Sequence, residues 1–196
     1  MNEHLIALAD SFSGTSVLVL GDLILDEWIW GTVSRISPEA PIPVVDVDSV
    51  TYSPGGACNV ASNIVALGGR PLLFGLLGDD HEARTLIGEL QRRGVDPAGL
   101  VIDKTRPTTR KTRIVAHNQQ VVRADRERRD PIGEQNLHEL LDRCISALGE
   151  VGALLISDYA KGVTAPSFLR AIIGEARERG VPVIVDPKGV DYSKYR

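Results

Sequence analysis

The feature that most constrains the fold of this chain is the alternation of short apolar runs with segments of helical period. Runs rich in Val, Leu and Ile occupy residues 17–20, 72–77, 153–156 and 183–185. Apolar residues recur every three or four positions over residues 57–67, 80–93, 133–148 and from about residue 166 onward. Apolar strands alternating with amphipathic helices are typical of a parallel sheet buried on both faces. The sequence therefore predicts an α/β fold with a mainly parallel sheet.

Two stretches interrupt this alternation. Residues 40–48 are β-rich, and within residues 110–125 two β-rich runs flank Asn118 and Gln119. Because no long helix separates these runs, they predict a small antiparallel flap carried by the main sheet. A length of 196 residues and a hydrophobic content of 43% predict one domain, alone or with a small appendage.

Charge and composition exclude several classes of function. The formal net charge of -4 gives no basic excess for binding nucleic acid. The two cysteines, Cys58 and Cys144, lie far apart and fit neither a zinc site nor a disulfide framework, so we expect buried thiols in a reducing compartment. The first residues do not resemble a signal peptide, and no apolar run approaches the roughly 20 residues of a membrane span. We therefore expect a cytoplasmic protein.

Polar residues follow three of the predicted strands at the point where each strand ends. They are Asp22 and Asp26, then Asp158 and Lys161, and finally Asp186 and Lys188. Ligands of open α/β sheets bind outside the carboxyl ends of the strands. A single aspartate there is more often a helix cap or a turn residue. Three such strand ends, two of them with a nearby lysine, favour a site for a polyhydroxylated, phosphorylated ligand.

The segment Ser53-Pro-Gly-Gly-Ala-Cys-Asn-Val-Ala-Ser-Asn63 is the most specific signal in the chain. Gly55 and Gly56 allow the backbone to approach a ligand closely at a helix start, and Asn59 offers a donor and an acceptor to sugar hydroxyls. A plain turn is the alternative reading of the two glycines. Neither GxGxxG nor GxxxxGK[ST] occurs, so the common nucleotide-binding motifs are absent from the sequence.

Six segments together resemble a known family. In order they are GDLILDEWIWG, RISPEAPIPVV, PGGACNVASNIVALGG, NQQVVRADRE, SDYAKG and DPKG. From about Val17 to the last residue, the chain resembles the heptose 7-phosphate kinase branch of the ribokinase-like carbohydrate kinases. The glycine pair with Asn59 is a family-wide feature, whereas RISPEAPIPVV and NQQVVRAD resemble the heptose branch. Two departures from the family are mild: Cys58 replaces a more common alanine, and Trp28 and Trp30 lie in a variable aromatic region.

The resemblance implies a ribokinase-like three-layer fold with a small β lid, whose segments are expected at about residues 40–50 and 110–125. Residues 1–196 would then be the N-terminal part of one kinase domain. The family lid closes over the sugar, and in many members it pairs with the lid of a second subunit. We therefore expect a homodimer formed through the lid.

The resemblance also implies roles for individual residues. The expected substrate-binding residues are Asp26, Gly55, Gly56, Asn59, Gln119, Arg123, Asp158 and Lys161. Asn118 and Gln120 accompany Gln119 and Arg123 on the lid, where some of the four are expected to face the substrate. An ion pair with Asp125 or another surface carboxylate is an equally good reading of Arg123. Asp186 and Lys188 are expected beside the nucleotide phosphates, and no protein metal ligand is assigned.

The implied reaction uses ATP and Mg²⁺ to phosphorylate O1 of D-glycero-β-D-manno-heptose 7-phosphate, on the route to ADP-heptose and lipopolysaccharide core. The family's catalytic base lies in a glycine-alanine-glycine-aspartate segment, which this sequence lacks. We expect that base beyond Arg196, and we expect the 196 residues alone to be inactive. The cation that binds the 7-phosphate stays open among Arg35, Arg110, Lys111 and Arg113. The alternatives are another sugar kinase of this fold, or a non-catalytic sugar-phosphate-binding or dimerisation module.

Overall fold

The computed structural model describes residue 7 and residues 11–196. Its main sheet contains five parallel strands in the order β5-β4-β1-β8-β9. These strands are β1 (Ser16–Gly21), β4 (Arg70–Leu77), β5 (Leu100–Ile102), β8 (Ala153–Ser157) and β9 (Val183–Asp186). The predicted α/β fold with a mainly parallel sheet is confirmed. The three-residue strand β5 was not predicted, because it is too short to give a hydrophobic pattern.

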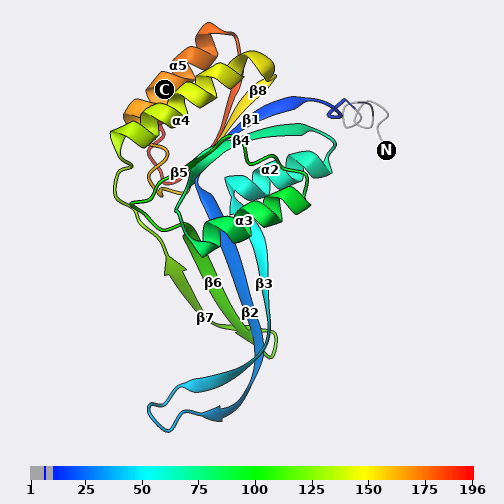
Figure 1. The fold of residues 1–196 in the computed structure, drawn as a ribbon, viewed down its shortest axis with the longest axis vertical. Helices are drawn as coiled ribbons and strands as arrows, with labels where there is room; N and C mark the ends of the chain where they lie inside the picture. The colour runs from blue at the N-terminus through cyan, green and yellow to red at the C-terminus, as the bar shows by residue number, and fades with distance from the viewer. Residues whose placement is uncertain (1–6, 8–10) are drawn as a thin grey trace.

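Two pairs of helices cover the sheet (Figure 1). They are α2 (Ala57–Ala66) with α3 (His81–Arg92), and α4 (Glu134–Ala147) with α5 (Pro166–Glu178). Alternate residues of β1 serve the two cores, because successive side chains of a strand point to opposite faces. Leu18 and Leu20 pack in the α4–α5 core, and Val19 packs in the α2–α3 core. Short 3₁₀ turns occupy Leu148–Glu150 and Ser193–Tyr195.

The two cysteines lie in these cores, as predicted. Both are free, and both are fully buried. Burial raises the pKa of the Cys58 thiol to about 12 and also raises that of Cys144. Both side chains therefore act as small apolar groups. No helix in the part of the chain that the structure describes is long and apolar enough to cross a membrane.

A second sheet, which we call the lid, extends away from the main sheet (Figure 1). Its strands, in the order β3-β2-β6-β7, are β2 (Leu23–Ile36), β3 (Pro43–Gly56), β6 (Thr109–Ala116) and β7 (Gln119–Arg126). β2 pairs with β6 in parallel, and the other two pairings are antiparallel. The predicted flap segments fall within β3, β6 and β7 and the turns beside them, but β2 was not predicted.

The position of Asp26 is accordingly corrected: it lies inside β2 and not in a loop after the first strand. Only Asp22 separates β1 from β2. β2 begins in the core, where residues 23–25 are buried, and then emerges into the lid. Because its environment changes along its length, its sequence shows no single hydrophobic period.

The turn between β6 and β7 consists of His117 and Asn118, one residue earlier than the predicted Asn118 and Gln119. Both residues have positive φ, at 50° and 61°. Positive φ at both central residues is required by the type I′ turn of a two-residue hairpin. The turn pairs Ala116 with Gln119.

Candidate functional site

A cavity of about 460 Å³ lies where the lid strands leave the main sheet. Asp26 of β2, residues 53–56 at the end of β3, and Asn59 of α2 line it. Four predicted site residues, Asp26, Gly55, Gly56 and Asn59, therefore meet at one place. The cavity wall is mainly polar, as expected for a site that binds a hydrophilic molecule.

Gly55 and Gly56 are required by close packing at this wall. A Cβ atom at Gly55 would lie 2.3 Å from Asp26 Oδ2, and one at Gly56 would lie 2.3 Å from the carbonyl oxygen of Asp22. Gly56 also has a φ of 57°, which disfavours other residues. Gly55 thus brings the backbone of β3 directly against Asp26, and Gly56 brings it against the backbone of Asp22. The sequence predicted a close backbone approach here but not that Asp26 is the neighbour.

Arg113 orients the Asp26 carboxylate. Its Nη1 atom donates to Asp26 Oδ1 at 2.6 Å, and its guanidinium lies 4.7 Å from the centre of the Trp28 ring. Both partners of the ion pair are about one-fifth exposed. Because Arg113 occupies Oδ1, the Oδ2 atom beside Gly55 is the oxygen of Asp26 without a bond to Arg113.

Lys111 and Tyr159 complete the wall near the carboxyl end of β8. Lys111 Nζ lies 5.6 Å from the centre of the Tyr159 ring, a cation–π contact that leaves its N–H donors free. Within residues 11–196 no carboxylate forms an ion pair with Lys111. The cavity therefore contains one cation whose charge is not neutralised by the protein.

Asn59 and Ser62 project from the first two turns of α2 toward the same space. The Asn59 side chain is exposed and has no hydrogen-bond partner among the residues that the structure describes. Ser62 Oγ donates to the Cys58 carbonyl at 2.8 Å. Asn59 thus has a free donor and a free acceptor, the combination that recognises a hydroxyl group.

The opposite face of the lid carries a set of ionic contacts. Arg110 Nη1 donates to Glu82 Oε1 of α3 at 2.8 Å, and Arg126 donates to the same oxygen at 3.1 Å. Thr112 donates to Glu27 at 2.5 Å. Glu27 and Glu82 are both buried. Arg110 therefore joins the lid to α3 and does not line the cavity.

Asp22, which the sequence placed at a strand end, has a structural role. Its buried carboxylate accepts backbone N–H groups from Tyr159, Lys161 and Val163, at 2.8, 3.1 and 3.4 Å. Burial raises the pKa of the Asp22 carboxyl, although these hydrogen bonds act in the opposite direction. Asp22 thereby fixes the loop that follows β8.

Asp158 is buried at the end of β8 and is already engaged. It accepts hydrogen bonds from the Ala160 amide at 2.7 Å, from the Tyr195 hydroxyl at 2.6 Å and from Lys194. Burial acts to raise the pKa of Asp158, but these hydrogen bonds outweigh it and lower the pKa below its ordinary value. Asp158 is thus a charged group held at the sheet edge by the segment that follows β9.

The remaining predicted site residues lie outside the cavity wall. Lys161 pairs with Glu127 at 2.5 Å, beside a hollow of only about 20 Å³. Asp186 and Lys188 are exposed at the end of β9. Gln119 is exposed at the start of β7. Arg123 forms the alternative ion pair with Asp125, at 2.9 Å.

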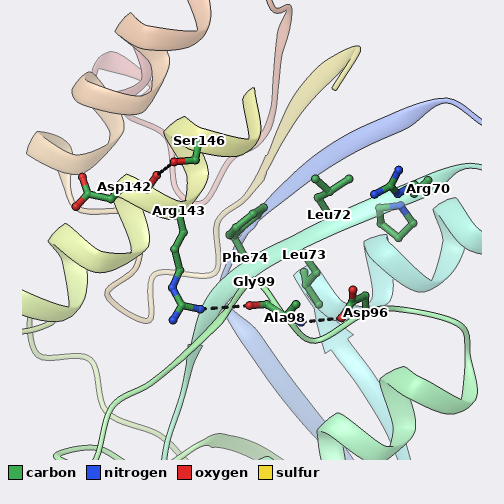
Figure 2. A pocket seen from close by; sticks show the side chains of 11 residues that line it. Arg70, Leu72, Leu73, Phe74, Asp96, Ala98, Gly99, Asp142, Arg143 and Ser146 are labelled. Carbon is green, nitrogen blue, oxygen red and sulfur yellow. Dashed lines mark hydrogen bonds between the residues drawn. The ribbon is translucent and has the colours of Figure 1, made fainter. Parts of the chain in front are cut away.

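A larger hollow of about 570 Å³ lies at the other end of β4, between α4 and the segment before β5 (Figure 2). Leu72, Leu73 and Phe74 line it together with Asp96, Ala98 and Gly99. Arg143, one of its two cations, already donates to the carbonyl oxygens of Ala98 and Leu100, each at 3.2 Å. This hollow is apolar and lies away from the carboxyl edge of the sheet, so it is not the candidate site.

Sequence reasoning missed Tyr159 and Arg93, which both line the cavity. Tyr159 directly follows Asp158, so its position at a strand end was a usable signal. Arg93 gave no signal, because its position follows from how α3 packs beside β3. The alternation of side chains along β6 would have separated Arg110 from Lys111 and Arg113.

Comparison with known proteins identifies the family that the sequence of this chain matches. The family described as "pfkB family carbohydrate kinase" matches residues 15–196. The bifunctional protein HldE of Geobacter metallireducens is 49% identical over 181 residues, which are 92% of this chain and 37% of that protein. HldE of Caulobacter sp. strain K31 is 48% identical over 195 residues, covering 100% of this chain and 39% of that protein. The chain thus spans less than two-fifths of the length of these relatives.

Solved structures show the same fold at low identity. Phosphofructokinase-2 from Escherichia coli in complex with fructose-6-phosphate superposes with a TM-score of 0.64 at 20% identity, covering 90% of this chain and 55% of that chain. Arabidopsis thaliana ribokinase complexed with ribose and ATP gives a TM-score of 0.61 at 15% identity, covering 91% and 55%. These similarities confirm the predicted ribokinase-like fold.

Proposed function

The chain belongs to the pfkB family of carbohydrate kinases, and we propose that it forms the sugar-binding part of a heptose 7-phosphate kinase. The proposed reaction transfers the γ-phosphoryl group of ATP to O1 of D-glycero-β-D-manno-heptose 7-phosphate. The product is the 1,7-bisphosphate, a precursor of ADP-heptose and of lipopolysaccharide core. We place the reaction in the cytoplasm, where ATP is made.

The observation that carries this proposal is the contact of Gly55 with the free oxygen of Asp26 at the cavity wall. Asp26 accepts hydrogen bonds from sugar hydroxyls, and Asn59 both donates and accepts. The choice of a heptose is supported by the segments RISPEAPIPVV and NQQVVRAD. It is also supported by the 48% identity to HldE of Geobacter sulfurreducens over 92% of this chain.

Phosphoryl transfer depends mainly on positioning and on stabilising negative charge. In the proposed complex, Asp26, Gly55, Gly56 and Asn59 hold the sugar. Asp158 and Lys161 lie at the next strand end, where they border the path of the phosphoryl group. The catalytic base is not among these 196 residues, since the sequence has no glycine-alanine-glycine-aspartate segment.

ATP is the proposed phosphoryl donor, as supported by the family and by the ATP complex of Arabidopsis ribokinase. The exposed Asp186 and Lys188 at the end of β9 are the proposed neighbours of its phosphates. We propose that Mg²⁺ is bound mainly by the ATP phosphates, where it neutralises their charge.

We also propose that two copies of the chain pair through their lids. Exposed apolar side chains gather on the lid, namely Trp30, Ile36, Ile42, Val47, Val50, Val121 and Val122. Apolar groups concentrated on one exposed element are typical of an interaction surface. Sedimentation of the protein should give a dimer, and the Val122→Asp variant should shift it toward monomer. A monomeric wild-type protein would contradict this pairing.

A kinetic comparison tests the proposed reaction. The whole gene product should consume ATP with heptose 7-phosphate far faster than with ribose or fructose. A preference for an unphosphorylated sugar would exclude the heptose assignment. The isolated 196 residues should bind the sugar without turnover, and heptose-dependent ATP consumption by them would contradict the placement of the base.

A further inference from the structure

The cavity contains three cationic side chains, and two of them are already paired. Arg113 donates to Asp26 at 2.6 Å, and Arg93 is bonded to Glu89. Lys111 has no carboxylate partner within the part of the chain that the structure describes. An unpaired cation in a polar cavity is costly unless water or an anionic ligand solvates it. Lys111 is thus the one lining cation among these three that is free to bind an anion.

The position of Lys111 is fixed by the lid. Its neighbours in the sheet are Asp26 on β2 and Asp125 on β7. Contact with the Tyr159 ring directs the ammonium group toward the carboxyl edge of the main sheet. Arg113 lies two residues along on the same face of β6, roughly 6–7 Å away by strand geometry. A dianionic group beside Lys111 would therefore also feel the charge of Arg113.

We propose that Lys111 binds the phosphate of a phosphorylated sugar and so determines the preference for it over the unphosphorylated sugar. This inference rests on the proposed function, because it places the phosphate in the same cavity as the sugar hydroxyls. The hydroxyls contact Asp26 and Asn59, and the phosphate accepts hydrogen bonds from Lys111 Nζ.

The other candidate cations are excluded by their surroundings. Arg110 lies on the opposite face of β6, where Glu82 binds it at 2.8 Å. Arg35 is exposed near the far end of β2, where it pairs with Val44 in the sheet. Lys161 is neutralised by Glu127 at 2.5 Å. Of the candidates left open by the sequence, Lys111 combines a place in the cavity with an unpaired charge.

The test compares Lys111→Met with Lys111→Arg and with the control Lys104→Met in the whole gene product. Lys104 is exposed on the loop before β6 and lies outside the cavity. Calorimetry would measure the affinity for heptose 7-phosphate and for the same heptose without phosphate. Loss of one charged hydrogen bond predicts that Lys111→Met weakens binding of the phosphorylated sugar by about 10- to 100-fold. Binding of the unphosphorylated heptose should be unchanged.

Lys111→Arg should retain most of the affinity, and Lys104→Met should match the wild type. Equal weakening for both sugars in Lys111→Met, or no weakening for either, would overturn the role of Lys111 while leaving the proposed function intact. A wild-type protein that prefers a different phosphorylated sugar, with the same dependence on Lys111, would overturn the heptose assignment alone. A wild-type protein that binds no phosphorylated sugar would overturn both.

A measurement on the wild-type protein avoids any effect of the substitutions on folding. Inorganic phosphate should compete with heptose 7-phosphate for binding, and it should not weaken binding of the unphosphorylated heptose. If a large excess of inorganic phosphate did not weaken the binding of heptose 7-phosphate, the result would contradict the proposed anion site.

Discussion

The two faces of the lid carry similar residues but differ in how their charges are used. On the face toward α3, Arg110 and Arg126 share the buried Glu82, and Thr112 donates to the buried Glu27. On the cavity face, Asp26 is held by Arg113 alone, and Lys111 has only an aromatic contact. Arg110 and Thr112 of the first face alternate with Lys111 and Arg113 of the second along the same strand, β6.

This difference indicates that the face toward α3 contributes to stability and that the cavity face is available for binding. Buried charges are tolerated when their partners satisfy them, so the α3 face joins the lid to the main sheet. The cavity face leaves Lys111, Asn59 and one Asp26 oxygen without such partners, and groups of this kind are free to bind a ligand. Substitutions on the α3 face should therefore lower stability, and substitutions on the cavity face should lower affinity.

The largest effect is expected for Gly55→Ala. The added methyl group would lie 2.3 Å from Asp26 Oδ2, so the carboxylate must shift and its bond to Arg113 is disturbed. Sugar affinity should fall by about 100-fold or more, and overpacking should cost about 1–3 kcal/mol of unfolding free energy. Calorimetry and denaturant unfolding would measure the two effects.

Gly88→Ala is the matched control, because a Cβ there meets nothing within 4 Å and the residue lies inside α3. It should leave affinity unchanged and stabilise the protein by up to about 1 kcal/mol. If Gly55→Ala bound the sugar with wild-type affinity, Gly55 would not be part of the sugar-binding site.

Glu82→Gln should affect stability without affecting affinity. Its side chain is 10% exposed, and it is the shared acceptor of Arg110 and Arg126. Removing its charge leaves both guanidinium groups with a weaker partner, so unfolding free energy should fall by about 2 kcal/mol. Denaturant unfolding checks the stability, and sugar titration checks the affinity. A large loss of affinity at unchanged stability would reverse the assignment of the two faces.

Tyr195→Phe extends the comparison to the edge of the main sheet, where Asp158 is also held by hydrogen bonds from neighbouring residues. Loss of the 2.6 Å hydrogen bond should cost about 1 kcal/mol at neutral pH. The pKa of Asp158 is lowered in the folded state, so its stabilisation is present above its unfolded pKa and is lost as pH falls through the folded pKa. The difference in unfolding free energy between the wild type and the variant should thus shrink below about pH 4. A difference in unfolding free energy that does not change with pH would argue against the hydrogen bond from Tyr195 to Asp158.

The smallest effect is expected for the stability of Lys111→Met. Among residues 11–196 the one interaction of the Lys111 side chain is with the Tyr159 ring, at 5.6 Å. Unfolding free energy should therefore change by less than about 0.5–1 kcal/mol. Thermal unfolding of the variant beside Lys104→Met would measure this. A loss as large as that of Glu82→Gln would show that Lys111 is a structural residue.

The main sheet could be predicted from sequence because its strands are buried on both faces and its helices have one apolar stripe. β2 could not, because it passes from the core into the lid and its pattern changes on the way. β5 was too short to detect. Gly55, Gly56 and Asn59 gave a local signal because they lie at the start of a helix. Asp26 lies inside β2, and the resemblance to the kinase family is what joined it to the other three.

The rest of the site depends on contacts between distant segments. Alternation along β6 places Lys111 and Arg110 on opposite faces, but only the partners on each side show which face is the cavity. No partner for Asp158 or Lys161 could be identified from the sequence. In the structure Tyr195 donates a hydrogen bond to Asp158, and Glu127 forms an ion pair with Lys161. Such pairings follow from packing and are not visible in the local pattern.

The most direct test of the central claim is a crystal structure of the protein with heptose 7-phosphate bound. We predict sugar hydroxyls within hydrogen-bond distance of Asp26 and Asn59, with the ring against Gly55 and the phosphate beside Lys111. A sugar bound elsewhere, with the cavity between the lid and α2 left to solvent, would contradict the account.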